Sequence, residues 1–147
     1  MTRKDVTEKV LKAKEEKGVT FEDIAEAVGQ SKVWVTAAIM GQASMSENEA
    51  NALTGFLGLE PEVAKTLQGF PIKGSLDNTV PVDPLIYRFH EITQVYGTTM
   101  KAIIHEMFGD GIMSAIDFEI DIQKKEDPKG DRVVVTYNGK FLPYKKW

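Results

Sequence analysis

The residues most suited to chemistry are concentrated between positions 83 and 116, in the stretch DPLIYRFHEITQVYGTTMKAIIHEMFGDGIMSAI. Here Arg88 stands three positions before Glu91, a spacing that makes the two side chains neighbours on a helix. Such a carboxylate can hold the planar guanidinium in place and leave its remaining N–H donors for a small anion. The same spacing also fits a simple surface ion pair, which contributes about 0.3–0.5 kcal/mol. Both interpretations stay open on the pattern alone.

Ser114 follows the glycine-flanked sequence GDG. It does not form a nucleophile elbow, because GIMSA lacks the second glycine of that motif and no partner base is evident from the sequence. A capping or solvated serine is the ordinary alternative. As a functional group, its hydroxyl is better suited to binding an anion, together with free backbone N–H groups of the GDG loop.

Other kinds of active site have little support. The chain has no cysteine, which excludes disulfides, thiolate metal sites and a cysteine nucleophile. Its two histidines, His90 and His105, are 15 residues apart and do not form the HExxH zinc motif, so we expect structural roles for both. Met100, Met107 and Met113 are interpreted as core residues. Neither GxGxxG nor a P-loop is present, so a nucleotide cofactor is not expected.

Charge and composition narrow the range of partners. The chain has 147 residues, 42% of them hydrophobic, which suits one or two folded domains rather than a disordered chain. Residues 1–76 and residues 77–147 each carry 9 basic and 11 acidic residues, so neither half has the basic excess that nonspecific nucleic-acid binding needs. No apolar run reaches the roughly 18 residues of a membrane span, and the N-terminus lacks a signal-peptide core. With no cysteine, a soluble cytoplasmic protein is expected.

The first half predicts a bundle of five helices. Apolar periodicity, caps and glycine stops place them near residues 5–17, 20–28, 31–40, 46–57 and 61–67. The second and third, separated by Gly29, have the helix-turn-helix pattern. The third helix offers no arginine to read guanine and follows a helix with three acidic residues, so DNA binding is not expected. We interpret this half as a packing module, with Trp34 in the core or at an interface.

A proline- and glycine-containing stretch, residues 69–82, predicts an extended connection. It separates two domains, residues 1–75 and residues 76–147. The second domain is expected to begin with a helix that has Asp83 as N-cap and Pro84 as its first residue. Gly97 is expected to end this helix, and a second one is expected from Thr98 to Gly109.

After GDG the apolar period changes from that of a helix to the alternation of a strand. We predict three strands, at residues 116–123, 132–137 and 140–147, with a turn at DPKGD and a hairpin at Asn138-Gly139. So small a sheet leaves open edges, and the valines at positions 133–135 are too apolar for one. We therefore expect the strands to pair with another subunit.

The second half carries long motifs in a fixed order. The segment YRFHEITQVYGTTMKAIIHEMFGDGIMSAIDF contains YRF-x-E, then QVYGTT, then HE-x-FGDGI-x-SAI, and NG with KFLP follows in the last strands. This order resembles the signature of the cyanase (cyanate hydratase) family over essentially residues 80–147. The helical first half agrees with that family's helix-turn-helix-like (lambda-repressor-like) N-terminal bundle, which is not known for binding DNA.

The resemblance implies an α+β fold whose C-terminal strands are intertwined in a dimer. It also implies a decamer of five dimers with active sites between subunits. The implied reaction converts cyanate and bicarbonate into carbamate and carbon dioxide, after which carbamate gives ammonia and more carbon dioxide. Cyanate detoxification and nitrogen supply would follow. Bicarbonate is a co-substrate, and no metal or organic cofactor is used. The family's catalytic arginine, glutamate and serine correspond to Arg88, Glu91 and Ser114.

A second hypothesis is a transcription regulator, in which an N-terminal helix-turn-helix is joined to a dimerisation domain that senses a small anion. The acidic balance and the missing arginines of the third helix argue against it.

Overall fold

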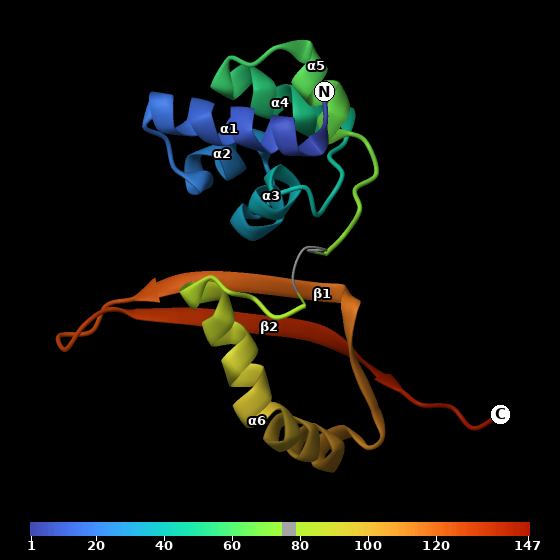
Figure 1. Ribbon diagram of the computed structural model, residues 1–147. Helices are drawn as coiled ribbons and strands as arrows, with labels where there is room; N and C mark the ends of the chain where they lie inside the picture. The colour runs from blue at the N-terminus through green and yellow to red at the C-terminus, as the bar shows by residue number, and fades with distance from the viewer. Residues whose placement is uncertain (75–78) are drawn as a thin grey trace. The chain divides into compact units, whose positions relative to one another are not determined.

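Five short helices make up the first unit of the chain, Met1–Gly74, in a computed structural model that describes residues 1–74 and 79–147 (Figure 1). They confirm the predicted bundle. Their bounds are α1 Arg3–Lys17, α2 Phe21–Val28, α3 Lys32–Ile39, α4 Glu47–Leu57 and α5 Pro61–Leu67.

Side-chain caps determine where these helices begin. Thr20 and Asp23 form a reciprocal capping box at α2, in which each side chain accepts from the other residue's backbone N–H. Ser46 and Glu49 do the same at α4. Both boxes confirm the predicted starts. Hydrogen bonds from the cap residues' backbone N–H groups lower the pKa of Asp23 and of Glu49.

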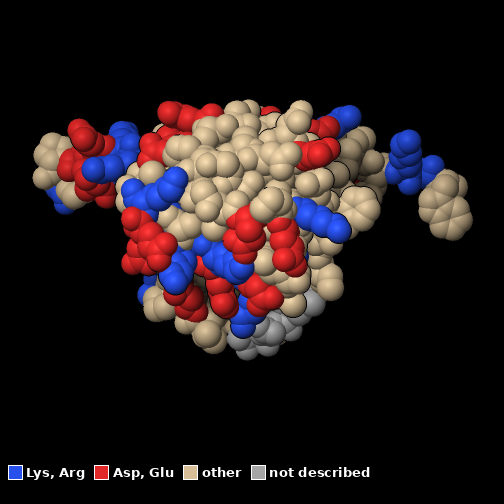
Figure 2. All heavy atoms as spheres, turned by 90° about the horizontal axis from the view of Figure 1, so that it is seen from above, with Lys and Arg blue, Asp and Glu red and all other residues tan. Residues whose placement is uncertain are grey.

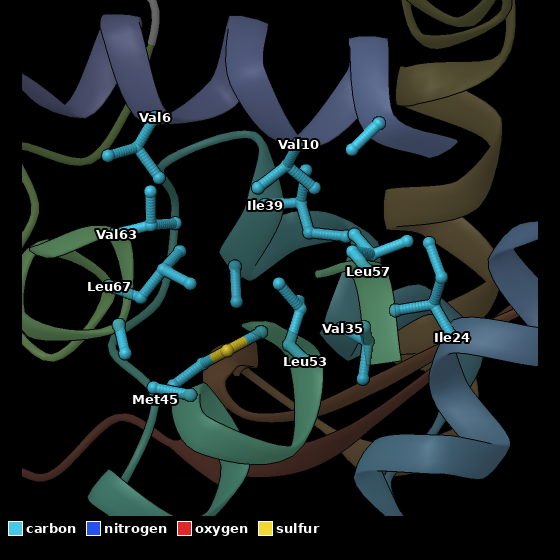
Figure 3. Close-up of a cluster of buried hydrophobic side chains, with 14 of the residues drawn as sticks. Val6, Val10, Ile24, Val35, Ile39, Met45, Leu53, Leu57, Val63 and Leu67 are labelled. Carbon is cyan, nitrogen blue, oxygen red and sulfur yellow. The ribbon is translucent and has the colours of Figure 1, made fainter. Parts of the chain in front are cut away.

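The core of the first unit is aliphatic and well buried (Figure 3). Residues from every one of the five helices contribute to it, because each helix presents one apolar face inward. The largest fully buried side chains are Val6, Val10, Ile24, Val35, Ile39, Leu53, Val63 and Leu67. Trp34 is only partly buried and packs against this cluster, so the prediction of a core role for it is confirmed in part.

Arg3 joins the ends of three segments through their backbone carbonyl groups. Its guanidinium donates to Thr66 O at 3.1 Å, Ala38 O at 3.2 Å and Ala43 O at 2.5 Å. These carbonyls lie at or beyond helix ends, where intrahelical partners run out. Burial lowers the pKa of Arg3. The arginine therefore links the ends of α3 and α5 to the segment that follows α3.

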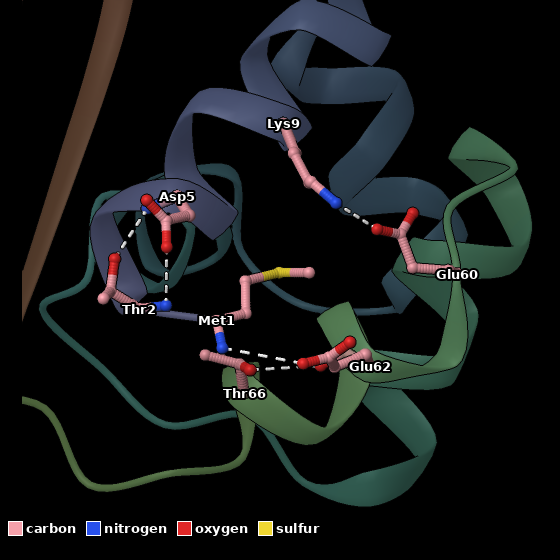
Figure 4. Close-up of polar contacts among 7 residues, drawn as sticks. All are labelled: Met1, Thr2, Asp5, Lys9, Glu60, Glu62 and Thr66. Carbon is pink, nitrogen blue, oxygen red and sulfur yellow. Dashed lines mark hydrogen bonds and ion pairs between the residues drawn. The ribbon is translucent and has the colours of Figure 1, made fainter.

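Helix α1 is also tied to the start of α5 (Figure 4). Lys9 forms an ion pair with Glu60, and the N-terminal amine lies 3.6 Å from Glu62. The Lys9 side chain lowers the pKa of Glu60 by donating to its carboxylate. Both pairs are exposed, so packing of the core contributes far more to stability than they do.

The second unit begins with one long helix, α6 Pro84–Phe108, and not with the two predicted helices. Its start is as predicted, because the Asp83 side chain accepts from the backbone N–H groups of Leu85 and Ile86. The predicted break at Gly97 is wrong. Gly97 is not among the glycines with positive φ, and α6 continues through it. The apolar periodicity on both sides outweighs the roughly 1 kcal/mol that an internal glycine costs.

Two long antiparallel strands, β1 Gly111–Lys125 and β2 Arg132–Pro143, complete the fold, and the class is α+β as predicted. The turn lies at DPKGD, as expected. The predicted hairpin at Asn138-Gly139 is wrong, because both residues lie inside β2 and pair with Glu119 and Phe118. The second and third predicted strands are therefore one strand. Of the predicted connection at residues 69–82, residues 75–78 lie outside the described part.

The second unit has almost no core of its own. Helix α6 buries none of its 25 residues, and Ile116 on β1 is 98% exposed. A two-stranded hairpin with an unpacked helix is not independently stable in water, and exposed apolar surface of this extent marks an interaction surface. The large apolar side chains exposed on α6 are Leu85, Ile86, Phe89, Ile92, Val95, Tyr96, Met100, Ile103, Met107 and Phe108.

Candidate functional site

Arg88 and Glu91 form the ion pair that their spacing predicts. Arg88 Nη1 donates to Glu91 Oε2 at 3.0 Å, and the side chains are 61% and 46% exposed. The guanidinium also lies over the ring of Tyr87, 6.0 Å from its centre. Among the described residues this is the one hydrogen bond of the Arg88 side chain, so most of its five donors have no protein partner there. The pair is oriented, accessible and open to an anion.

Ser114 differs sharply from that pair because it is buried, with 6% exposure, in a unit where nearly everything else is exposed. Its hydroxyl oxygen accepts hydrogen bonds from the backbone N–H groups of Ile116 at 3.1 Å and of Asp117 at 2.9 Å. It lies where the register between β1 and β2 is interrupted. The hydroxyl is therefore held rigidly, as an anion-binding group must be.

The GDG segment connects α6 to β1. The expectation of free N–H groups there does not hold for Gly109, whose N–H donates to His105 O at 2.9 Å and ends the helix. Gly111 already belongs to β1 and is opposite Pro143. A side chain at Gly111 would meet Leu142 O at 2.3 Å, so this glycine allows close approach of the two strands.

The two histidines have different surroundings. His105 Nε2 lies 3.4 Å from Lys101 Nζ and 3.3 Å from Gly111 O. The contact with Gly111 joins the end of α6 to the start of β1. His90 is half-buried against Tyr87, and its Nε2 has no partner among the described residues. Over residues 1–74 and 79–147, no group of three or more His, Cys, Asp or Glu residues is arranged to hold a metal ion.

Within the helix-turn-helix segment, α2 has no basic residue and α3 has one. Lys32, the basic residue of α3, pairs with Glu22 of α2 at 2.9 Å. On the face shown in Figure 2, acidic and basic side chains are interspersed. None of the helices in the described ranges combines the length and hydropathy that a membrane span requires.

One chain does not bring the three predicted residues together by direct contact. Among the hydrogen bonds and ion pairs of the described residues, none joins Ser114 to Arg88 or to Glu91. Their role in one site stays a prediction. Gly139, which the sequence placed in a turn, lies in β2 beside the Ser114 carbonyl group. Fold and site together define a class: an α+β protein with residues suited to a small anion and a broad uncovered apolar surface.

Comparison with known proteins names the family. The family model "Cyanate hydratase, N-terminal" matches residues 3–71, and "Cyanate lyase C-terminal domain" matches residues 78–146. Cyanate hydratase of Acaryochloris marina (strain MBIC 11017) is 57% identical over 97% of each chain. That of Variovorax paradoxus (strain S110) is 55% identical over the full length of both. A crystal structure of cyanase from T. urticae has a TM-score of 0.85 at 43% identity, covering 95% of this chain and 97% of that one.

The chain therefore belongs to the cyanate hydratase (cyanate lyase) family, a family of lyases. This confirms the resemblance seen in the motifs of the second half. The alternative of a transcription regulator finds no support among these relatives.

Proposed function

We propose that the chain is a cyanate hydratase whose second substrate is bicarbonate. Cyanate, bicarbonate and one proton give carbamate and carbon dioxide, and carbamate with a second proton gives ammonia and carbon dioxide. The observation that carries the proposal is the likeness to curated cyanate hydratases over the whole chain, at 55% identity across all 147 residues in one case. The physiological outcome is removal of cyanate and supply of nitrogen.

Arg88 offsets the repulsion between the two reactants. Two like unit charges about 4 Å apart repel by about 4 kcal/mol at an effective dielectric constant near 20. A guanidinium with its remaining donors available can bind an anion in a forked geometry and reduce that cost. Arg88 therefore brings bicarbonate and cyanate together, and Glu91 keeps the guanidinium in the orientation that this requires.

Ser114 fixes the linear cyanate ion. Its hydroxyl is buried and held by two backbone N–H groups, so it donates in one direction. Holding both reactants in line removes much of the entropy cost of their encounter. A fixed donor also stabilises negative charge that shifts during the reaction.

Oligomerisation completes the site in this proposal. The uncovered apolar surface of α6 and the exposed valines of β2 need a covering partner, and a second copy of the chain supplies one. We propose a homodecamer of five dimers with intertwined strands, in which several copies of Arg88 and Ser114 converge between subunits.

The proposed reaction uses no metal and no organic cofactor, since the charge on Arg88 and the donors at Ser114 supply the electrostatic stabilisation. Its partners are the small anions and other copies of the chain, with no part for nucleic acid or membrane. A cytoplasmic location is included in the proposal, because a chain without cysteine suits a reducing compartment.

The test is a turnover assay with the purified full chain. Ammonia is measured after mixing the protein with cyanate and bicarbonate, against a blank without protein. Protein-dependent ammonia release is the expected result. Absence of ammonia from a correctly assembled preparation would refute the proposed activity and favour a binding function.

A further inference from the structure

The strand pairing around Ser114 contains an unusually large bulge. Met113 is opposite Phe141, and the next paired residue of β1, Phe118, is opposite Gly139. Positions 114–117 of β1 therefore stand against the single position 140 of β2. Bulges bend a strand and redirect its side chains, often beside active sites, and β1 is bent in Figure 1.

Within this bulge the serine is locked by its own backbone. Ser114 Oγ accepts from Ile116 N at 3.1 Å and from Asp117 N at 2.9 Å. A hydroxyl has two acceptor positions and one donor hydrogen. Because both acceptor positions are occupied, the O–H group is left to donate, and no lone pair remains for nucleophilic attack.

Gly139 is the residue that allows the bulge to lie against β2. A Cβ atom at this position would be 2.6 Å from Ser114 O and 2.5 Å from Met113 Cγ. The Met113 side chain can move away, but the Ser114 carbonyl belongs to the backbone that forms the bulge. Gly139 does not have positive φ, so it is not needed for its backbone conformation. What the position requires is the absence of a side chain.

We propose that Gly139 is a positioning residue for Ser114, and that the 114–117 bulge makes the Ser114 hydroxyl an obligate donor to the substrate anion. The effect on turnover rests on the proposed function. The effect on the bulge itself does not.

The principal variant is Gly139→Ala in the full chain. We expect kcat/KM for cyanate to fall on the order of 10–100-fold, since displacements near 1 Å at a site cost up to about that much. Inhibition by azide, a linear anion of the same charge as cyanate, weakens by a similar factor. Gly55→Ala is the matched control, because Gly55 lies inside α4 with open space at its Cβ, and it leaves both values unchanged.

Two further variants separate positioning from a merely structural effect. In the double variant with Met113→Ala and Gly139→Ala, the new Cβ atom at position 139 no longer meets the Met113 side chain. It still lies 2.6 Å from Ser114 O, so we expect turnover of the double variant to remain impaired. Recovery of activity in that double variant would overturn the proposal. The double variant with Gly139→Ala and Ser114→Ala should be inhibited by azide as strongly as Ser114→Ala alone. The effects of two substitutions do not add when one residue acts through the other. Additive losses would also overturn it.

Hydrogen exchange tests the bulge without relying on activity. In Ser114→Ala and in Gly139→Ala, the amides of Ile116 and Asp117 should exchange at least about tenfold faster than in the unaltered chain, because they lose their acceptor or its geometry. Unchanged exchange in Ser114→Ala would refute the locked hydroxyl, and this holds even if Gly139→Ala fails to assemble. An unaltered chain without cyanate turnover would refute the proposed function, and the exchange result would still decide the positioning.

Discussion

Substitutions in the pair Arg88 and Glu91 should change turnover strongly and the stability of the fold only slightly. The paired atoms are 3.0 Å apart, but the side chains are 61% and 46% exposed, so the pair contributes about 0.3–0.5 kcal/mol to folding. Glu91→Gln should therefore lower the melting temperature by no more than about 2 °C. If the pair were only a surface ion pair, activity would change equally little.

The proposed roles predict much larger effects on turnover. Arg88→Ala removes the positive charge that offsets anion repulsion, and loss of one such donor costs on the order of 10²–10³ in rate. Glu91→Gln keeps the guanidinium and removes only its orientation, so we expect a loss of about tenfold, close to one charged hydrogen bond. Steady-state ammonia release at saturating cyanate and bicarbonate measures both, and thermal unfolding is followed on the same samples.

Matched controls are available on the same chain. Arg132→Ala and Glu106→Gln alter exposed residues outside the site and should leave turnover unchanged. Normal turnover in Arg88→Ala would refute the role of Arg88 in binding the anions. A loss in Glu91→Gln equal to or greater than that in Arg88→Ala would show that Glu91 takes part in proton transfer rather than in orientation.

Four further predictions concern assembly and the first unit. Sedimentation of the full chain should show a species far heavier than 16.4 kDa, and a monomer alone would contradict the assembly argument. Subunits of Arg88→Ala and Ser114→Ala can be mixed, dissociated and reassembled. Because sites shared between subunits would then include some with both residues intact, the mixture should be more active than either variant alone. Absence of recovery would show that both residues of a site come from one chain. Arg3→Met should destabilise the first unit by about 2–5 kcal/mol in urea unfolding, since three carbonyls lose a charged donor, and an unchanged midpoint would refute that role. Hydrogen bonds from Thr20 lower the pKa of Asp23 in the folded chain. The ionised Asp23 therefore stabilises the fold fully above the ordinary carboxyl pKa of about 4, and this stabilisation is lost as the pH falls through the lower pKa of the folded state. The urea midpoint should drop as the pH falls below about 4, and by less in Asp23→Asn; equal drops would exclude this carboxylate as a cause.

The features that sequence predicted well are those decided locally. The capping boxes of Thr20 and Ser46 and the Asp83 cap depend on residues within three positions of one another. The alternation from Ile116 to Ile122 likewise predicted a strand, because a half-buried strand imposes a period of two. The three helices begin where these caps placed them, and β1 contains the predicted residues 116–123 but begins earlier, at Gly111.

The wrongly predicted helix break and the wrongly predicted hairpin both concern glycine. At Gly97 a helix continues through a residue that often ends one, because the apolar face on each side continues without a change of phase. At Gly139 the dipeptide Asn-Gly is typical of a hairpin turn, but here the glycine allows close approach of two backbones. Glycine suits both a hairpin turn and a close approach of two strands. At Gly139 only the register between β1 and β2 shows which of the two applies.

The sequence nominates candidate residues for the site, and their roles stay predictions, whereas the local geometry around them comes from the structure. Arg88 and Glu91 lie on one helix face, so spacing alone placed them together. The fixed position of the Ser114 hydroxyl depends on a bulge in the pairing of β1 with β2. The turn that joins these strands is distant in sequence, so no local pattern predicts the bulge. The proposed sharing of a site between chains would depend on an interface between subunits, and the spacing of residues in one sequence does not define such an interface.

The dependence of turnover on bicarbonate is the most direct test of the proposed reaction. Ammonia release from a fixed concentration of cyanate is measured with the full chain in buffer freed of carbon dioxide, while bicarbonate is raised from zero. We expect a rate near the blank without bicarbonate and a saturating increase as bicarbonate is added. A substantial rate that does not change with bicarbonate, or no rate at any concentration, would contradict the proposed reaction.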